Sequence, residues 1–109
     1  MRSVLVQVLM CVRMAVIVRV PLVPGIIPIL SGHQIRKFTA LCGAELPAPV
    51  LQRLDELGNQ EEAVAEFGIE HATRQCQELL QAGAPGVHFY TLNKARSTTR
   101  ILRNLGAAA

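Results

Sequence analysis

The chain has 109 residues, of which half are hydrophobic and 17% are charged, and its net charge is +3 with a pI near 9.1. This composition excludes a disordered chain, and the length suits one domain but not a complete eight-stranded βα barrel of about 250 residues. The positive charge does not indicate nucleic-acid binding, because the basic residues are scattered and aromatic residues amount to only 4%, with no Trp.

Residues 1–19 form an apolar segment whose start, with Arg2 followed by a run of aliphatic residues, imitates a signal peptide. No small-residue cleavage site follows, and Arg13 and Arg19 interrupt the apolar stretch, so we predict neither a leader nor a membrane-spanning helix. We therefore treat residues 1–19 as an atypical N-terminal segment and expect a cytoplasmic protein without membrane contact.

Residues 20–30, VPLVPGIIPIL, form a continuous apolar run without alternation. Such a run favours a strand that is covered on both faces, as in parallel sheets. Proline cannot donate a hydrogen bond to a neighbouring strand. The strand is therefore expected to end, bulge or pass an edge near Pro24, Gly25 and Pro28.

Ser31 is predicted to cap a helix that runs to about Leu41, with Gln34 completing a capping box and Gly43 ending the helix. The residues expected to face inward are Ile35, Phe38 and either Leu41 or Cys42. A short second helix is predicted to start at Pro47 or Pro49 and to end at Gly58. Its apolar side would consist of Val50, Leu51, Leu54 and Leu57.

The longest helix is predicted over residues 60–81, with Asn59 and Glu62 as its capping pair and Gly83 just beyond its end. Apolar residues recur in it every three or four positions, which is typical of a helix with one buried face. These residues are Val64, Phe67, either His71 or Ala72, Cys76 and Leu79.

Residues 87–92, Val-His-Phe-Tyr-Thr-Leu, predict a compact strand in which His88 is buried and hydrogen-bonded. Asn93 is expected to cap a last helix that Gly106 terminates. Its buried residues would be Ile101, Leu102 and Leu105, and its exposed ones Arg96, Arg100 and Arg103. Each strand leads directly into a capped helix, which is the pattern of right-handed βα units.

Neither the cysteines nor the histidines predict a metal site. The residues concerned are Cys11, Cys42 and Cys76, and His33, His71 and His88. The cysteines are odd in number and have no C-x-x-C spacing, which also argues against a disulfide framework, and the histidines fall in three different elements. We expect reduced thiols, with Cys42 and Cys76 packed in the interior.

Two stretches resemble the methylenetetrahydrofolate reductase family: VPGIIPILSGHQIRKFTALCGAELP at residues 23–47 and GVHFYTLNKA at residues 86–95. In that family a Pro-Gly-Ile/Leu-x-Pro strand end leads to a helix with Gln and Phe four residues apart, and the closing strand reads His-Phe-Tyr-Thr-Leu-Asn. The resemblance covers roughly residues 20–106. It implies an α/β fold in which residues 20–109 are the C-terminal fragment of a (βα)8 TIM-type barrel, with about two strands and their helices.

The resemblance also implies an enzyme that uses FAD and NAD(P)H to reduce 5,10-methylenetetrahydrofolate to 5-methyltetrahydrofolate, and it leaves NADH and NADPH open. By family position, Gln34 would hydrogen-bond the folate, Phe38 would pack against the ligand, Leu92 would line the same pocket, and Lys94 would contact the glutamate tail where the family often has Arg. The family's flavin-binding residues and proton-donating acid lie on earlier strands. No catalytic or cofactor-binding residue is therefore expected in this chain.

The fragment is not expected to turn over alone, and its expected partners are a second copy of itself or a complementary barrel fragment. A frameshift, a misassigned start or a degraded gene would each explain why residues 1–19 depart from the family. The main alternative is a non-catalytic, truncated interaction module that docks on a partner chain. A weaker one is a membrane-associated protein anchored through residues 1–20.

Overall fold

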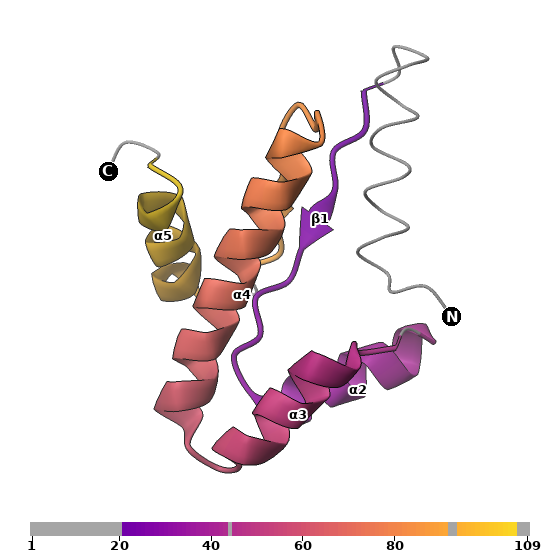
Figure 1. The fold of residues 1–109 in the computed structure, drawn as a ribbon, viewed down its shortest axis with the longest axis vertical. Coiled ribbons are helices and arrows are strands. Elements are labelled where there is room, and N and C mark those ends of the chain that lie inside the picture. The colour runs from indigo at the N-terminus through magenta and orange to yellow at the C-terminus, as the bar shows by residue number, and fades with distance from the viewer. Residues whose placement is uncertain (1–20, 44, 92–93, 107–109) are drawn as a thin grey trace.

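The structure, a computed structural model, describes residues 21–43, 45–91 and 94–106 (Figure 1). Its elements in chain order are β1 (Gly25–Ile26), α2 (Gly32–Cys42), α3 (Ala48–Leu57), α4 (Glu61–Gln81), β2 (His88–Phe89) and α5 (Ala95–Asn104). The predicted order of strand, helices, strand and helix is confirmed. Our predictions for residues 1–19, Leu92 and Asn93 fall outside the described residues.

β1 and β2 form a two-stranded parallel sheet in which Gly25 pairs with His88 and Ile26 pairs with Phe89. The His88 N–H donates to the Pro24 carbonyl and the Tyr90 N–H donates to the Ile26 carbonyl, both at 2.9 Å. Because the strands are parallel, their carboxyl ends lie at the same edge of the sheet, which we call the carboxyl edge. The segments that lead into α2 and α5 therefore start from the same edge.

Both strands are shorter than predicted, and the first is not covered on both faces. Burial alternates along its segment: Pro24, Ile26 and Pro28 are buried, whereas Val23 is 55% exposed and Ile27 is 39% exposed. The buried side packs on α4, which lies beside β1 in Figure 1. The prediction of two covered faces is wrong because the described part of the chain supplies a layer of helices on one side of the sheet only.

Helix α4 contributes more residues to the core than any other element and lies between α5 and β1 (Figure 1). One cluster joins β1, α4 and α5, and its buried residues are Ile26, Ile69, Ala72, Cys76, Leu79, Ala84 and Ile101. A second cluster joins α3, α4 and the segment after β1, and its buried residues are Ile29, Val50, Leu54 and Val64. The apolar periodicity of α4 is thus confirmed, with Ala72 rather than His71 fully buried.

Helix α4 meets the segment after β1 backbone to backbone at Gly68. A Cβ atom on Gly68 would lie 1.7 Å from the carbonyl oxygen of Ile29 and 2.7 Å from its carbonyl carbon. Only a hydrogen fits in this space. The contact fixes the chain two residues before Ser31, where α2 begins.

The start and end of α2 agree with the sequence prediction. The Ser31 hydroxyl accepts a hydrogen bond from the Gln34 N–H at 3.0 Å, which is the serine half of the predicted capping box. Gly43 ends the helix with φ at 68°, a left-handed conformation that favours glycine. However, Leu41 is 75% exposed and Cys42 is exposed too, so neither faces inward.

One predicted helix cap and one predicted buried residue are wrong. The N-cap residue of α4 is Gln60 rather than Asn59, and it makes no side-chain capping bond. The N-cap residue of α5 is Lys94, one position after the predicted Asn93. Leu102 is exposed, so α5 buries fewer apolar residues than predicted. Both helix starts lie one residue from the predicted cap, which is the usual precision with which helix ends are defined.

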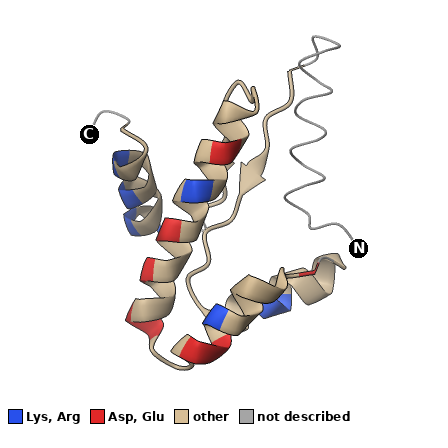
Figure 2. Cartoon of the chain, in the orientation of Figure 1, with Lys and Arg blue, Asp and Glu red and all other residues tan. Residues whose placement is uncertain are grey.

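Two ion pairs with equal spacing join the exposed sides of α4 and α5, which carry acidic and basic residues respectively (Figure 2). Glu62 pairs with Arg96 at 3.3 Å, and Glu66 pairs with Arg100 one helical turn further on. Exposed pairs of this kind add little stability individually. None of the helices that the structure describes is both long and apolar enough to cross a membrane.

Candidate functional site

Gln34 and Phe38 lie on α2, the helix that follows the carboxyl edge of β1. Gln34 is the third residue of this helix, and Phe38 lies one turn later. Residues four positions apart share one side of a helix, so both half-buried side chains project to the same side. The structure therefore brings these two predicted residues together.

Lys94 lies after the carboxyl end of β2, as the exposed N-cap residue of α5. Its backbone N–H donates to the Thr91 carbonyl at 2.8 Å. A cation at a helix N-terminus interacts unfavourably with the helix dipole, so helix stability does not account for a lysine here. Leu92 lies outside the described residues, and the structure leaves its predicted role untested.

Tyr90 is a candidate that the sequence reasoning missed. It directly follows β2, and its side chain is 49% exposed. Its ring leans over Gly25, where an added Cβ would lie 2.4 Å from Tyr90 Cε2. A signal was present, because Tyr90 is the only tyrosine in a chain that is poor in aromatic residues.

His88 is exposed, which corrects the prediction that it is buried and hydrogen-bonded. Its ring meets the Tyr90 ring edge to face, with centroids 4.8 Å apart and an interplanar angle of 79°. The prediction failed because His88 points to the face of the sheet that the described residues leave uncovered.

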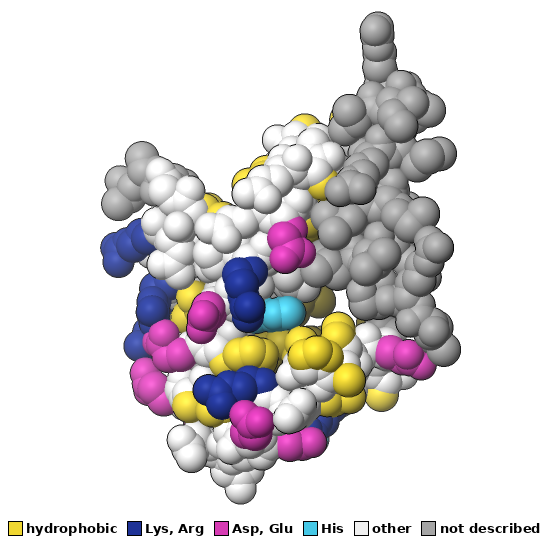
Figure 3. Space-filling view, viewed as in Figure 1, with side chains coloured by type: hydrophobic (Ala, Val, Ile, Leu, Met, Phe, Trp, Pro, Cys, Tyr) yellow, Lys and Arg dark blue, Asp and Glu magenta, His cyan; other side chains and the backbone are white. Residues whose placement is uncertain are grey.

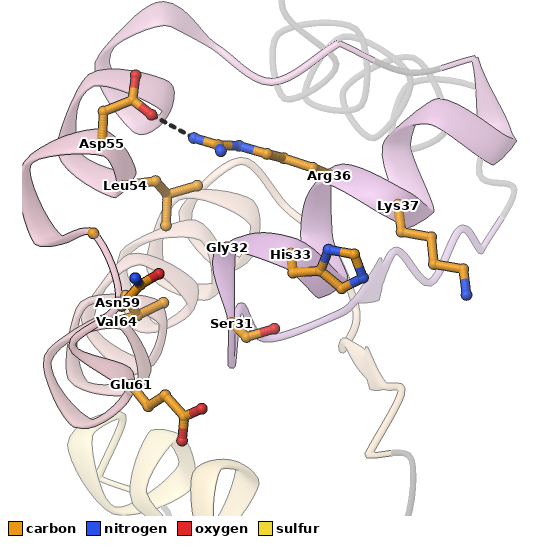
Figure 4. A pocket seen from close by; sticks show the side chains of 11 residues that line it. Ser31, Gly32, His33, Arg36, Lys37, Leu54, Asp55, Asn59, Glu61 and Val64 are labelled. Carbon is orange, nitrogen blue, oxygen red and sulfur yellow. Dashed lines mark hydrogen bonds and ion pairs between the residues drawn. The ribbon is translucent and has the colours of Figure 1, made fainter.

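A groove of about 700 Å³ lies between the first turns of α2, the end of α3 and the start of α4 (Figure 4). Arg36 on α2 and Asp55 on α3 form an ion pair at 2.5 Å across it, while His33 and Lys37 line the α2 wall. Gln34, Phe38 and Lys94 do not line this groove. It is thus separate from the surface that carries the predicted folate residues.

The residues present do not fit FAD by themselves. A flavin ring system needs a largely enclosed, mostly apolar slot with a few converging polar groups. The grooves among the described residues are surface hollows lined in part by charged side chains, such as Glu66 and Arg100 in the groove of about 450 Å³ between α3 and α5. The described residues alone therefore do not form a flavin site.

Hydrophobic side chains gather on the face of the molecule shown in Figure 3. On α4, Phe67 stacks on His71 with ring centroids 5.8 Å apart. Burial, with a smaller contribution from Arg74, lowers the pKa of His71. This keeps the imidazole neutral to lower pH than usual. The arrangement is that of a packed histidine on a helix surface.

The two thiols in the described part of the chain differ. Cys76 is fully buried, and its burial raises the pKa of its thiol, so the packed thiol predicted there is confirmed. Cys42 is exposed, and the same prediction for it is wrong. Among the described residues, no three His, Cys, Asp or Glu side chains are grouped closely enough to hold a metal ion.

Comparison with known proteins identifies the relatives of this chain. The sequence profile of the family "Methylenetetrahydrofolate reductase" matches residues 5–106. A methylenetetrahydrofolate reductase (NADH) of Zea mays is 38% identical over 86 residues, which are 79% of this chain and 14% of that protein. A probable methylenetetrahydrofolate reductase (NADPH) of Caenorhabditis elegans is 36% identical over 87 residues, 79% of this chain and 13% of that protein.

A bacterial relative is similar over the same share of the chain. The 5,10-methylenetetrahydrofolate reductase of Escherichia coli is 32% identical over 87 residues, which are 80% of this chain and 29% of that protein. The chain thus spans only a minor part of the length of the relatives it matches. With the profile covering nearly all of its residues, the chain belongs to the methylenetetrahydrofolate reductase family.

Proposed function

We propose that this chain is the folate-contacting C-terminal part of a methylenetetrahydrofolate reductase, which reduces 5,10-methylenetetrahydrofolate to 5-methyltetrahydrofolate with FAD and NAD(P)H. The observation that carries the proposal is the parallel register of β1 and β2. It leads both motif-bearing segments away from the same sheet edge, where βα barrels build their active sites. The two strands and their helices are then the last βα units of a (βα)8 barrel.

In this proposal four residues contact the folate. The Gln34 amide hydrogen-bonds the ligand, and Phe38, on the same side of α2, packs against one of its rings. Leu92 adds an apolar wall to the pocket. Lys94 attracts the carboxylates of the glutamate tail, but its single ammonium lacks the planar fork with which arginine binds a carboxylate at two points.

The remaining parts of the enzyme lie outside the described residues. FAD, when bound, supplies the hydride transfer, and the earlier strands of the barrel hold it together with NAD(P)H. The described residues include proposed folate contacts but no groove that fits a flavin, so we expect no turnover from the chain alone. A complementary barrel fragment is the partner that would complete the site.

The experiment is co-expression of the chain with the part of the E. coli reductase that precedes the matched region. We expect the two pieces to copurify with visible flavin absorbance and to bind 5-methyltetrahydrofolate in calorimetry. Gln34→Ala should weaken folate binding about tenfold, the loss of a buried hydrogen bond to a ligand. Gln52→Ala, on the exposed side of α3, is the matched control and should change nothing.

An interaction module without catalysis is the second candidate, and the exposed apolar side chains of Val23 and Ile27 favour it. These residues would dock on a partner chain whether or not a cofactor is present. The same co-expression separates the two functions. Copurification without flavin or folate binding supports the interaction module and contradicts the reductase proposal.

A further inference from the structure

Tyr90 is held in one orientation by neighbours on both strands. Since Gly25 pairs with His88, the parallel register places Tyr90 level with Ile27, one step beyond β2. The ring leans back over Gly25, so a Cβ atom built there would lie 2.4 Å from Tyr90 Cε2 and 3.2 Å from the phenolic oxygen. The ring of His88 supports it from the side, edge to face at 4.8 Å.

Backbone conformation does not explain the glycine at position 25. The glycines with positive φ are at positions 43, 58, 83 and 106, so Gly25 has a conformation that any residue adopts. What the position lacks is space for a side chain, and the group that occupies this space is the Tyr90 ring. Gly25 and His88 therefore act on Tyr90 together, one by leaving room and the other by aromatic contact.

We propose that Gly25 and His88 are positioning residues, which hold the Tyr90 ring down on the sheet so that its exposed side meets the folate ligand at the carboxyl edge. The inference rests on the proposed function, because it needs a ligand at this edge. It goes beyond the four residues that the family resemblance assigns. Neither Gly25 nor His88 has to touch the ligand.

The first test uses the isolated chain, whose aromatic circular dichroism contains one tyrosine and no tryptophan. Gly25→Ala should displace the ring and weaken the tyrosine band about twofold or more, since a flexible ring yields more easily than the backbone. Gly86→Ala is the matched control, because it makes the same chemical change where no atom lies within 4 Å. The far-ultraviolet circular dichroism spectrum, which reports secondary structure, should remain unchanged in both variants.

A second pair of variants keeps the test decisive if Gly25→Ala does not fold. His88→Ala removes the edge-to-face contact without adding atoms and should weaken the tyrosine band. His88→Phe keeps an aromatic ring and should restore the band toward the wild-type value. A role of His88 in stability alone would not produce this rescue.

The ligand test uses the complex with the E. coli fragment and 5-methyltetrahydrofolate. Gly25→Ala should weaken folate binding about threefold or more, the size of one aromatic contact, while Gly86→Ala should not. Unchanged folate affinity in Gly25→Ala, or an unchanged tyrosine band, overturns the inference and leaves the proposed function standing. If the wild-type complex does not bind folate, the proposed function fails, and the tyrosine band alone decides whether Gly25 holds the ring.

Discussion

Gly68 lies where α4 and the segment leading into α2 touch most closely. Because a Cβ atom at this position would lie 1.7 Å from a backbone oxygen of Ile29, no side-chain rotation relieves the clash. We expect Gly68→Ala to lower the free energy of unfolding by about 1–3 kcal/mol, the usual cost of overpacking a core. The free energy of unfolding is measured by urea denaturation, with circular dichroism as the signal.

Gly86→Ala serves as the control for Gly68→Ala, since the added methyl group meets nothing and the backbone stays compatible. In an exposed helix, replacing glycine with alanine stabilises the helix. A loss of stability in Gly68→Ala therefore cannot be due to helix propensity. Equal urea midpoints for the wild type and Gly68→Ala would show that α4 and Ile29 are not packed as described.

The two described cysteines should react very differently. Cys42 is exposed at the end of α2, whereas Cys76 is fully buried and burial raises the pKa of its thiol. In a Cys11→Ser background, Ellman's reagent should modify Cys42 rapidly in the native chain and Cys76 only after unfolding in urea. Rapid modification of both thiols under native conditions would show that the cluster around Cys76 is open.

The helices were predicted well because the sequence signals that start and end them are local. Ser31 and Gly43 bound α2 through contacts within a few residues, and the apolar spacing of α4 reflects one buried face. The strands were overestimated, because an apolar run such as residues 20–30 says nothing about how many layers will cover it. The face of the sheet that the described helices leave uncovered also explains why His88 is exposed.

The contact between α4 and α5 should depend on pH through Glu66. The hydrogen bond from Arg100 lowers the pKa of Glu66 below its usual value of 4.5. A carboxyl with a lowered pKa stabilises the fold above the pKa of the unfolded chain, and this contribution disappears as the pH falls through the lower, folded value. The wild type should therefore be more stable than Glu66→Gln at pH 7, and the difference should vanish in acid.

Unfolding in urea at several pH values measures this difference. Glu70→Gln is the control, since Glu70 lies one turn further along α4, is exposed, and has no ion pair among the described residues. Because the Glu66 and Arg100 side chains are accessible to solvent, added salt should reduce the effect as well. If the stability difference between the wild type and Glu66→Gln persists in acid, its cause is lost packing rather than lost charge.

The described part of the chain has helices on one side of a two-stranded sheet, and each strand has one unpaired edge. Val23 and Ile27 project from the uncovered side. Unpaired strand edges next to exposed apolar side chains favour association with other chains. In the barrel that we propose, neighbouring strands would occupy these edges, so the surface that completes the barrel is also the surface from which we expect association.

We therefore expect the isolated chain to self-associate as its concentration rises, which sedimentation velocity would detect. Val23→Lys places a charge on the uncovered side of the sheet and should shift the chain toward monomer, because charged residues on exposed strands oppose edge pairing. Leu41→Lys removes a still more exposed apolar residue from α2, away from the sheet, and should leave association unchanged. If both variants reduce association equally, general surface hydrophobicity rather than the open sheet drives association. The unpaired edges of the two strands would then not indicate that the chain needs partner strands.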